Sequence, residues 1–292
     1  MKKLLSKIVS VGLIFCMTGA MAGCSKSEET TKATTAADTT AADTTAGDSS
    51  AADTTAAAEK FTVQEGKLIM ATNAFFQPYE YYQGDKIVGI DAEIAEALAK
   101  KLGLELQIMD VEFDSIIAGV QNNKYDFGMA GMTVTDTRKK AVNFTTTYAT
   151  GIQAIIVKEG SEIVDIDTLL GGNYKVGVQQ GTTGDIYMSA EPDDGGVGES
   201  RIVRYSKGPD AVLALSTGKV DAVVIDNEPA KSFVAANEGL KILETPFTVE
   251  DYAMCVNKDN TVLLDKLNAA LKELTDDGTI ASIIEKYIPS NG

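Results

Sequence analysis

The chain between residues 61 and 292 repeats one pattern, in which a short apolar run leads into a polar turn and then a helical stretch. The apolar runs, which have the length of buried strands, lie at 67–72, 104–111, 125–130, 152–157, 174–179 and 220–225. Helical periodicity is clearest at 89–102, where Ile90, Ile94 and Leu98 recur every fourth residue. Such alternation predicts an α/β fold with a mostly parallel sheet and helices on both faces.

Other segments complete the expected organisation. Helical patterns are also found at 113–120, 261–275 and 278–287. The stretch 73–82 carries five aromatic residues and is predicted to be a loop, with Tyr79, Tyr81 and Tyr82 packing at the surface of the domain. The run 252–256 predicts one buried strand, in which Cys255 is a small core residue.

Hydroxyl and charged residues follow three of the predicted strands. Arg138 lies beyond 125–130, Thr182 and Thr183 follow 174–179, and Asp226 follows 220–225. Ligands of open α/β sheets bind beyond the carboxyl ends of the strands, so these residues are candidates for one site. Each also has a plain structural explanation: a surface arginine, an ordinary strand-to-helix turn and a helix N-cap.

The segment from Ala130 to Arg138 is the strongest single indication of a binding site. Its small residues allow a ligand to approach the backbone, and Thr133 supplies a hydroxyl donor. Arg138 supplies a planar guanidinium that can hold a carboxylate with two hydrogen bonds. The segment therefore predicts a carboxylate-binding socket.

Composition excludes several classes of function. The chain has 42 Asp and Glu against 26 Lys and Arg, which argues against nucleic acid and against electrostatic docking on anionic lipid. It has no histidine, which excludes Ser-His or Cys-His catalysis and histidine-ligated metal sites. Cys255 is the single cysteine after residue 60, so no disulfide forms within that part. We expect binding rather than catalysis, with no cofactor and no metal.

The first 23 residues have the features of a signal peptide. Lysines precede a short apolar run at 8–17, and small residues precede Cys24. This start resembles a bacterial lipoprotein signal, which implies cleavage before Cys24 and acylation (palmitate) of that cysteine. The alternative is an ordinary secretory signal with an incidental cysteine. Acyl chains on Cys24 would anchor the protein on the outer face of the cell membrane.

Residues 24–60 have the composition of a disordered tether. The sequence Ala-Ala-Asp-Thr-Thr occurs at 36–40, 41–45 and 51–55, and no apolar residue larger than alanine lies between 25 and 60. Such a stretch cannot bury enough surface to offset the entropy of ordering. We expect it to hold the following domain away from the membrane.

Four ordered blocks make the chain similar to a known family. They are the helix that begins at Gly89, the segment 130–144, the turn 180–183 and the segment 220–226. From about residue 64 to 288 the chain resembles the solute-binding proteins of polar amino acid ABC transporters, the extracellular solute-binding family 3. The resemblance implies a two-lobed α/β periplasmic-binding-protein fold of type II, with two hinge-connecting strands and the ligand in the interlobe cleft.

The resemblance also implies bounds for the parts. Lobe 1 is expected at 61–149 plus 251–292 and lobe 2 at 152–247. The hinges are expected near 150–151 and 248–250.

The resemblance assigns roles to individual residues. Arg138, with Thr133 and the backbone N–H of Thr183, would hold the α-carboxylate of an amino acid. Asp226, with the carbonyl of Gly131, would hold its α-ammonium group. The candidate binding residues are Asn73, Phe76, Phe113, Ala130, Gly131, Thr133, Arg138, Gln179, Thr182, Thr183 and Asp226.

Selection of the ligand side chain is expected from four of these residues. Phe76 and Phe113 would be the apolar walls, and the uncharged amides Asn73 and Gln179 predict a neutral polar side chain. Two acids, Glu80 and Asp185, could also approach the pocket.

The sequence therefore predicts a monomeric, lipid-anchored receptor that captures a free L-amino acid and delivers it to an ABC transporter permease. One alternative is an enzyme on the same fold, such as a dehydratase of cyclic acids. Another is a sensory ectodomain, which would continue into a transmembrane helix and a signalling domain after residue 292.

Overall fold

The computed structural model describes residues 60–243 and 248–289. The predicted signal peptide, Cys24 and the predicted tether, except for Lys60, lie outside the described residues. Within the described ranges, every helix is too short or too polar to cross a membrane.

Two main sheets organise the described part of the chain. We define lobe 1 as the first sheet with the helices packed on it, and lobe 2 as the second sheet with its helices. The strands of the first sheet, in spatial order, are β5 (Glu105–Asp110), β1 (Lys67–Thr72), β6 (Phe127–Gly128), β14 (Cys255–Asn257) and β7 (Val142–Phe144). Those of the second are β10 (Ile202–Tyr205), β9 (Val176–Gln179), β11 (Ala222–Asp226), β8 (Ala149–Lys158) and β12 (Leu240–Ile242), with β13 (Val249–Tyr252) paired to β8.

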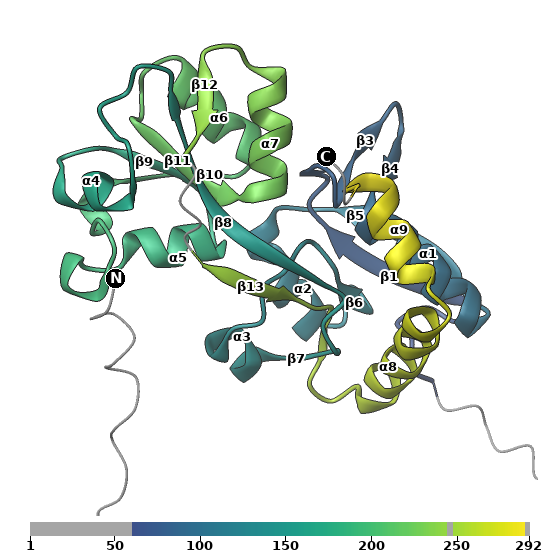
Figure 1. Cartoon of the computed structure of the whole chain (residues 1–292). Helices are drawn as coiled ribbons and strands as arrows, with labels where there is room; N and C mark the ends of the chain where they lie inside the picture. The colour runs from purple at the N-terminus through teal and green to yellow at the C-terminus, as the bar shows by residue number, and fades with distance from the viewer. Residues whose placement is uncertain (1–59, 244–247, 290–292) are drawn as a thin grey trace, which may run out of the picture. The chain divides into compact units, whose positions relative to one another are not determined.

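Helices cover both sheets (Figure 1). Lobe 1 carries α1 (Ile90–Leu102), α2 (Ile116–Gln121), α3 (Asp136–Ala141), α8 (Thr261–Asp276) and α9 (Thr279–Tyr287). Lobe 2 carries α4 (Ile166–Gly171), α5 (Thr183–Ser189), α6 (Gly208–Ser216) and α7 (Asn227–Ala236). Short 3₁₀ turns are η1 (Phe113–Ser115), η2 (Pro192–Asp194) and η3 (Glu199–Arg201). Helices α1, α8 and α9 lie side by side.

The central strands bury both of their faces. Along β1, Leu68 and Met70 pack in one cluster with Ile94 of α1, whereas Ile69 packs on the opposite face with Ile116 of α2. Successive side chains of a strand point to opposite faces, so an uninterrupted apolar run is what a sheet covered on both sides requires. This explains why the predicted strand at 67–72 is the observed one.

The prediction of a mostly parallel sheet is wrong. Parallel pairs join β1 to β5 and β6, and β9 to β10 and β11. Antiparallel pairs join β8 to β11 and β12, and β14 to β6 and β7. The reason is that β8 and β14 each enter a sheet from the other lobe. Each of them is therefore antiparallel to its neighbours in that sheet.

The aromatic stretch was predicted as a loop and is a small antiparallel sheet instead. It consists of β2 (Phe75–Phe76), β3 (Glu80–Gln83) and β4 (Lys86–Val88). Tyr79, predicted at the surface, is buried and packs edge-on against Tyr252 with ring centroids 5.3 Å apart. Tyr82 does lie at the surface.

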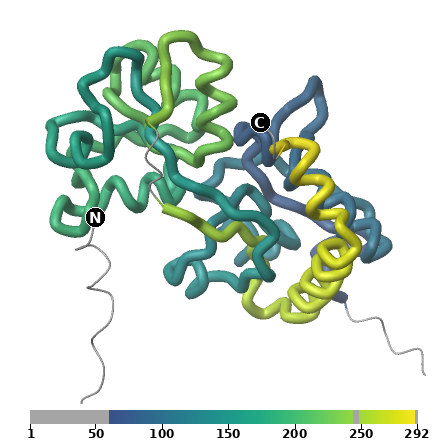
Figure 2. The backbone as a smooth tube through the Cα atoms, in the orientation of Figure 1, coloured from purple at the N-terminus to yellow at the C-terminus, as the bar shows by residue number. Residues whose placement is uncertain are grey.

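The two connections between the lobes are hydrogen-bonded to each other. Strand β8 pairs with β13 through its first residues, with Glu250 opposite Gly151, and then continues into the lobe 2 sheet. The crossing is visible in the tube trace of Figure 2. The predicted single strand at 252–256 is divided between β13 and β14, with Ala253 and Met254 between them. Cys255 is buried, as predicted.

The close packing of β8 and β13 also explains why residue 151 is a glycine. A Cβ atom on Gly151 would lie 1.9 Å from the Tyr252 hydroxyl oxygen, so only glycine allows Tyr252 to pass this close.

Candidate ligand-binding site

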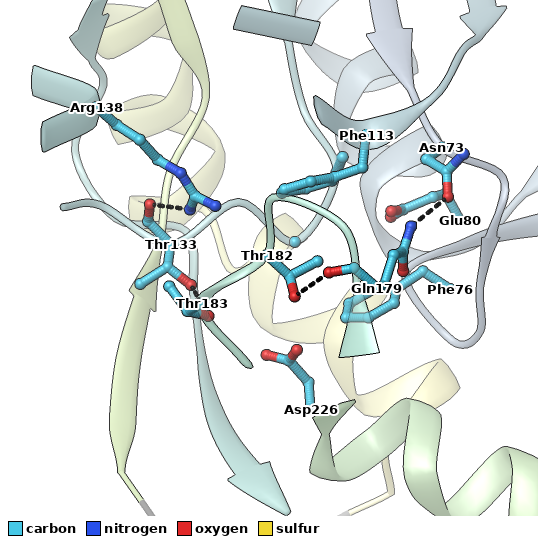
Figure 3. Close-up of a pocket in the computed structure, with 12 residues that line it drawn as sticks. Asn73, Phe76, Glu80, Phe113, Thr133, Arg138, Gln179, Thr182, Thr183 and Asp226 are labelled. Atoms are coloured by element: carbon cyan, nitrogen blue, oxygen red, sulfur yellow. Dashed lines mark hydrogen bonds between the residues drawn. The ribbon is translucent and has the colours of Figure 1, made fainter. Parts of the chain in front are cut away.

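One pocket between the lobes brings together all eleven candidate residues and adds Glu80. The free cavity volume between these side chains is about 10 Å³, roughly the space of one water molecule, so the two lobes lie close together around it. Its lining residues are Asn73, Phe76, Glu80, Phe113, Ala130, Gly131, Thr133, Arg138, Gln179, Thr182, Thr183 and Asp226. Figure 3 shows Arg138 at one end and Asn73 with Glu80 at the other, with Asp226 between them.

Arg138 is held at the boundary between the lobes. Thr135 is the N-cap of α3 and accepts a hydrogen bond from the backbone N–H of Arg138, which aims the side chain from the first turn. Nη1 donates to the carbonyl of Thr133 at 2.7 Å, and Nη2 donates to the carbonyl of Gly181 in lobe 2 at 2.9 Å. These bonds use two of the five guanidinium N–H groups and leave three for a ligand.

The face of Arg138 is covered by an aromatic ring. Its guanidinium carbon lies 5.4 Å from the centre of the Phe113 ring, within the range of a cation–π contact. The side chain is 6% exposed, and burial lowers the pKa of the guanidinium from its ordinary value. Within the described residues Arg138 has no ion-pair partner.

Gly131 is fixed against Phe76. Its φ of +51° favours glycine, and a Cβ there would lie 2.7 Å from the Phe76 ring. The Gly131 N–H donates to Asp91 at 2.9 Å, and the Tyr148 hydroxyl donates to the same oxygen at 2.8 Å. Asp91 lies in the first turn of α1, and its buried carboxylate holds the pocket backbone through this bond.

Asp226 occupies the N-cap position of α7 without capping it. Its carboxylate is 5% exposed and accepts a hydrogen bond from the Tyr252 hydroxyl. Burial raises the pKa of Asp226 to about 7, and the negative charge of Glu250 adds to the rise. The side chain that sequence alone could interpret as a cap is therefore turned toward the pocket.

The two threonines predicted to serve a carboxylate lie on opposite sides of the interlobe boundary. Thr133 precedes α3 in lobe 1, and Thr183 is the first residue of α5 in lobe 2. Their hydroxyl oxygens are 3.4 Å apart. Thr182 is the N-cap of α5, and its hydroxyl donates to the carbonyl of Gln179 at 2.8 Å.

The amides predicted to contact a ligand side chain also bind each other. Gln179 Nε2 donates to Asn73 Oδ1 at 2.9 Å and to the carbonyl of Ser206 at 3.2 Å. Asn73 Nδ2 donates to the carbonyl of Val111 at 2.7 Å. Both Nε2 hydrogens of Gln179 are used, so its contribution to the pocket is its carbonyl oxygen, an acceptor.

Glu80 is the lining residue absent from the predicted set. It is 1% exposed, and neither of its oxygens accepts a hydrogen bond from any described residue. Burial and the neighbouring Asp91 charge raise the pKa of Glu80 well above its usual range. The sequence offered one indication, an acid within an aromatic stretch directly after a strand end.

Asp185, the other acid considered, serves a different purpose. It accepts from Arg204 Nε at 2.9 Å and from the Gly181 N–H at 3.0 Å. It therefore supports the turn that presents the Gly181 carbonyl to Arg138. In the ranges 60–243 and 248–289, no three His, Cys, Asp or Glu side chains are grouped so as to hold a metal ion.

Comparisons with known proteins identify the family of the chain. The family model of the bacterial extracellular solute-binding proteins, family 3, matches residues 68–290. The arginine-binding extracellular protein ArtP of Bacillus subtilis is 35% identical over 225 residues, which cover 76% of this chain and 86% of that protein.

Solved structures are also similar. An ancestral arginine-binding protein bound to arginine superposes with a TM-score of 0.71 at 39% identity, covering 76% of this chain and 98% of the other. An ancestral arginine-binding protein bound to glutamine gives 0.70 at 38% identity, covering 77% and 99%.

Arg138→Lys keeps the charge and removes the planar fork. We expect binding of every amino acid in a panel of the common L-amino acids to weaken at least about 100-fold, because a point charge cannot replace a bidentate contact. Calorimetric titration measures the loss, and thermal unfolding checks the fold. Lys139→Ala, which removes the exposed neighbouring cation, is the matched control. Affinity retained in Arg138→Lys would contradict the role.

Acidification should weaken amino acid binding through Asp226. With its pKa at about 7, this carboxyl group loses its charge below neutrality and can no longer pair with an α-ammonium. We expect affinity to fall toward tenfold per pH unit, about 100-fold between pH 7 and 5. Titration calorimetry at pH 8, 7, 6 and 5 measures it, and Asp226→Asn should flatten the profile. A flat wild-type profile would refute the assignment.

The raised pKa of Asp226 also makes the stability of the unliganded protein depend on pH, with a trend opposite to that of ligand affinity. Between pH of about 4 and 7 the folded Asp226 keeps a proton that an unfolded aspartate has released. This group therefore makes the free energy of unfolding, without ligand, decline as pH rises through that window.

Proposed function

The chain belongs to family 3 of the bacterial extracellular solute-binding proteins, and from this membership we propose that it captures a free L-amino acid outside the cytoplasm and delivers it to an ABC importer. The observation that supports the proposal best is a pair of buried, opposite charges at one pocket. Arg138 comes from lobe 1 and Asp226 from lobe 2.

An amino acid backbone matches this pair. Its α-carboxylate would lie against the three free guanidinium N–H groups, and its α-ammonium would lie against Asp226. A buried zwitterion is tolerated only where each charge is paired and hydrogen-bonded. Because the two partners come from different lobes, a ligand that bridges them stabilises the closed cleft.

We further propose that the side chain of the ligand is cationic, with L-arginine as the first candidate. Glu80 is buried beside Asp91 without a cation, which raises its pKa, and a cationic ligand would offset the cost of its ionisation. The Gln179 carbonyl adds another acceptor, so this end of the pocket favours a donor-rich group such as a guanidinium. The names of the arginine-binding relatives agree with this choice.

A neutral polar side chain, predicted from Asn73 and Gln179, is the competing class. A protonated Glu80 could donate a hydrogen bond to an amide oxygen, and a similar protein has been solved with glutamine. Enzymatic activity on the same fold receives no support from the relatives, which are named as binding proteins.

Anchoring and assembly are proposals from the sequence. Cys24 is proposed as the acylated first residue of the mature protein, and residues 24–60 as its tether to the membrane. We propose that the receptor is a monomer.

A titration panel tests the proposed ligand. Protein from residue 60 onward, stripped of co-purified ligand by unfolding and refolding, is titrated with the common L-amino acids. We expect the tightest binding for L-arginine, with L-lysine next and L-glutamine weaker. Binding of no amino acid would contradict the proposed function, and preference for L-glutamine would contradict the cationic side chain alone.

Glu80→Gln separates the two classes of ligand. Removing one partner of a buried charge pair costs about 3 kcal/mol or more, so we expect L-arginine affinity to fall at least about 100-fold. Binding of L-glutamine should change much less, because no charge pair is lost. Asp85→Asn, in the exposed turn of the same small sheet, is the matched control. Equal losses for both amino acids would indicate a structural role for Glu80.

Cys24→Ser tests the anchor. A serine cannot carry the thioether-linked lipid, so we expect the full-length variant to move from the membrane fraction to the medium or the soluble extracytoplasmic fraction. Fractionation and immunoblotting measure this, and Cys16→Ser, within the predicted signal peptide, is the control. A Cys24→Ser variant that stays with the membrane would contradict lipid anchoring.

A further inference from the structure

Two threonine hydroxyls at the Arg138 end of the pocket, that of Thr133, which was predicted to serve the ligand, and that of Thr183, donate to a third residue. Thr133 Oγ1 donates to Glu250 Oε2 at 3.0 Å, and Thr183 Oγ1 donates to the same oxygen at 3.0 Å. One hydroxyl comes from lobe 1 and the other from lobe 2. Glu250 lies on β13, one of the two connections between the lobes.

Glu250 is built into this position. It is 4% exposed, and Oε2 also accepts from Gln153 Nε2 at 2.9 Å. Its other oxygen, Oε1, is buried, and the Tyr187 side chain also hydrogen-bonds to this carboxylate. Three donors therefore converge on one oxygen of a carboxylate on β13, the strand that pairs with β8 where the chain crosses between the lobes.

A hydroxyl group carries a single proton. Thr133 can donate it to Glu250 or to a ligand carboxylate, and the same holds for Thr183. A ligand carboxylate bound at these hydroxyls would also lie close to the negative charge of Glu250, and two like charges at one site repel each other. The charge of Glu250 already reaches the pocket, since it raises the pKa of Asp226.

We propose that Glu250 is an internal competitor of the ligand α-carboxylate for the hydroxyls of Thr133 and Thr183, and that it limits the affinity of the pocket. The inference rests on the proposed capture of an amino acid. When the ligand binds, the two threonine hydroxyls exchange their hydrogen bonds to Glu250 for hydrogen bonds to the ligand, so no hydrogen bond is added. The ligand carboxylate is also repelled by the Glu250 carboxylate. Glu250 is thus a positioning residue that keeps the affinity low enough for release to an importer.

The test compares a ligand with and without its carboxylate. Wild-type protein and Glu250→Gln are titrated with L-arginine and with L-argininamide, whose neutral amide replaces the α-carboxylate. Glu250→Gln keeps an oxygen that accepts from the hydroxyls and removes the charge. The control is Asp251→Asn, which removes one charge from the exposed side of the same strand.

We expect Glu250→Gln to bind L-arginine at least tenfold more tightly and to change L-argininamide binding less than threefold. Asp251→Asn should change both less than threefold. Weaker L-arginine binding, or the same change for both ligands, would overturn the proposal, because a merely structural role does not distinguish them. If Glu250→Gln does not fold, Glu250→Asp withdraws the carboxylate by one methylene, and the same preference for L-arginine is expected.

A second arm needs no ligand and separates this inference from the proposed function. If wild-type protein binds no L-arginine, the proposed ligand is wrong, and urea unfolding of Glu250→Gln, Thr183→Val and the double variant still decides the inference. Coupled side chains give midpoint shifts that do not add. Additive shifts would show that the hydroxyl and Glu250 do not interact, which overturns the proposal.

Discussion

The burial of one guanidinium group sets the conditions for the rest of the site. Arg138 remains charged inside the protein because backbone carbonyls of both lobes, those of Thr133 and Gly181, accept its hydrogen bonds. Asp185, itself bonded to Arg204, accepts a hydrogen bond from the Gly181 N–H and so supports the turn whose carbonyl binds Arg138. The position of lobe 2 is thus tied to the protonated side chain of lobe 1, and the pocket exists where the two meet.

Acids outnumber bases around this pocket, and that imbalance defines its chemistry. Glu80, Asp91, Asp226 and Glu250 are all buried, whereas Arg138 is the one buried basic side chain of the described residues. Each acid has a different local partner: the Gly131 N–H for Asp91, Tyr252 for Asp226 and the threonines for Glu250. Glu80 instead lies beside another acid, Asp91, which raises the pKa of Glu80, so a cation at that end of the pocket would favour the ionised form of Glu80.

The fold class and the residues at the strand ends followed from local pattern, whereas Asn73, Phe76, Phe113 and Gln179 came from the family resemblance. Strand ends place Arg138, Thr183 and Asp226 at sheet edges, and family resemblance pairs them across the lobes. Glu80 was named only as an acid that could approach the pocket, and Glu250 was not named. Glu250 could not be found from local pattern, because its hydrogen-bond partners Thr133 and Gln153 lie 117 and 97 positions away in the chain. The mixed strand directions were missed because the chain crosses between the lobes. A strand that enters a sheet from the other lobe need not follow the strand–helix–strand repeat that makes neighbouring strands parallel.

The paired strands β8 and β13 have a mechanical consequence. Two separate linkers would allow the lobes to tilt, twist and slide independently. Here Val249 to Tyr252 are bonded edge to edge with Ala149 to Ile152, and Tyr252 fits against Gly151. The two connections must therefore bend together as one hinge. The lobes then have essentially one direction of opening, and the contacts at the rim of the cleft form and break together as the hinge bends.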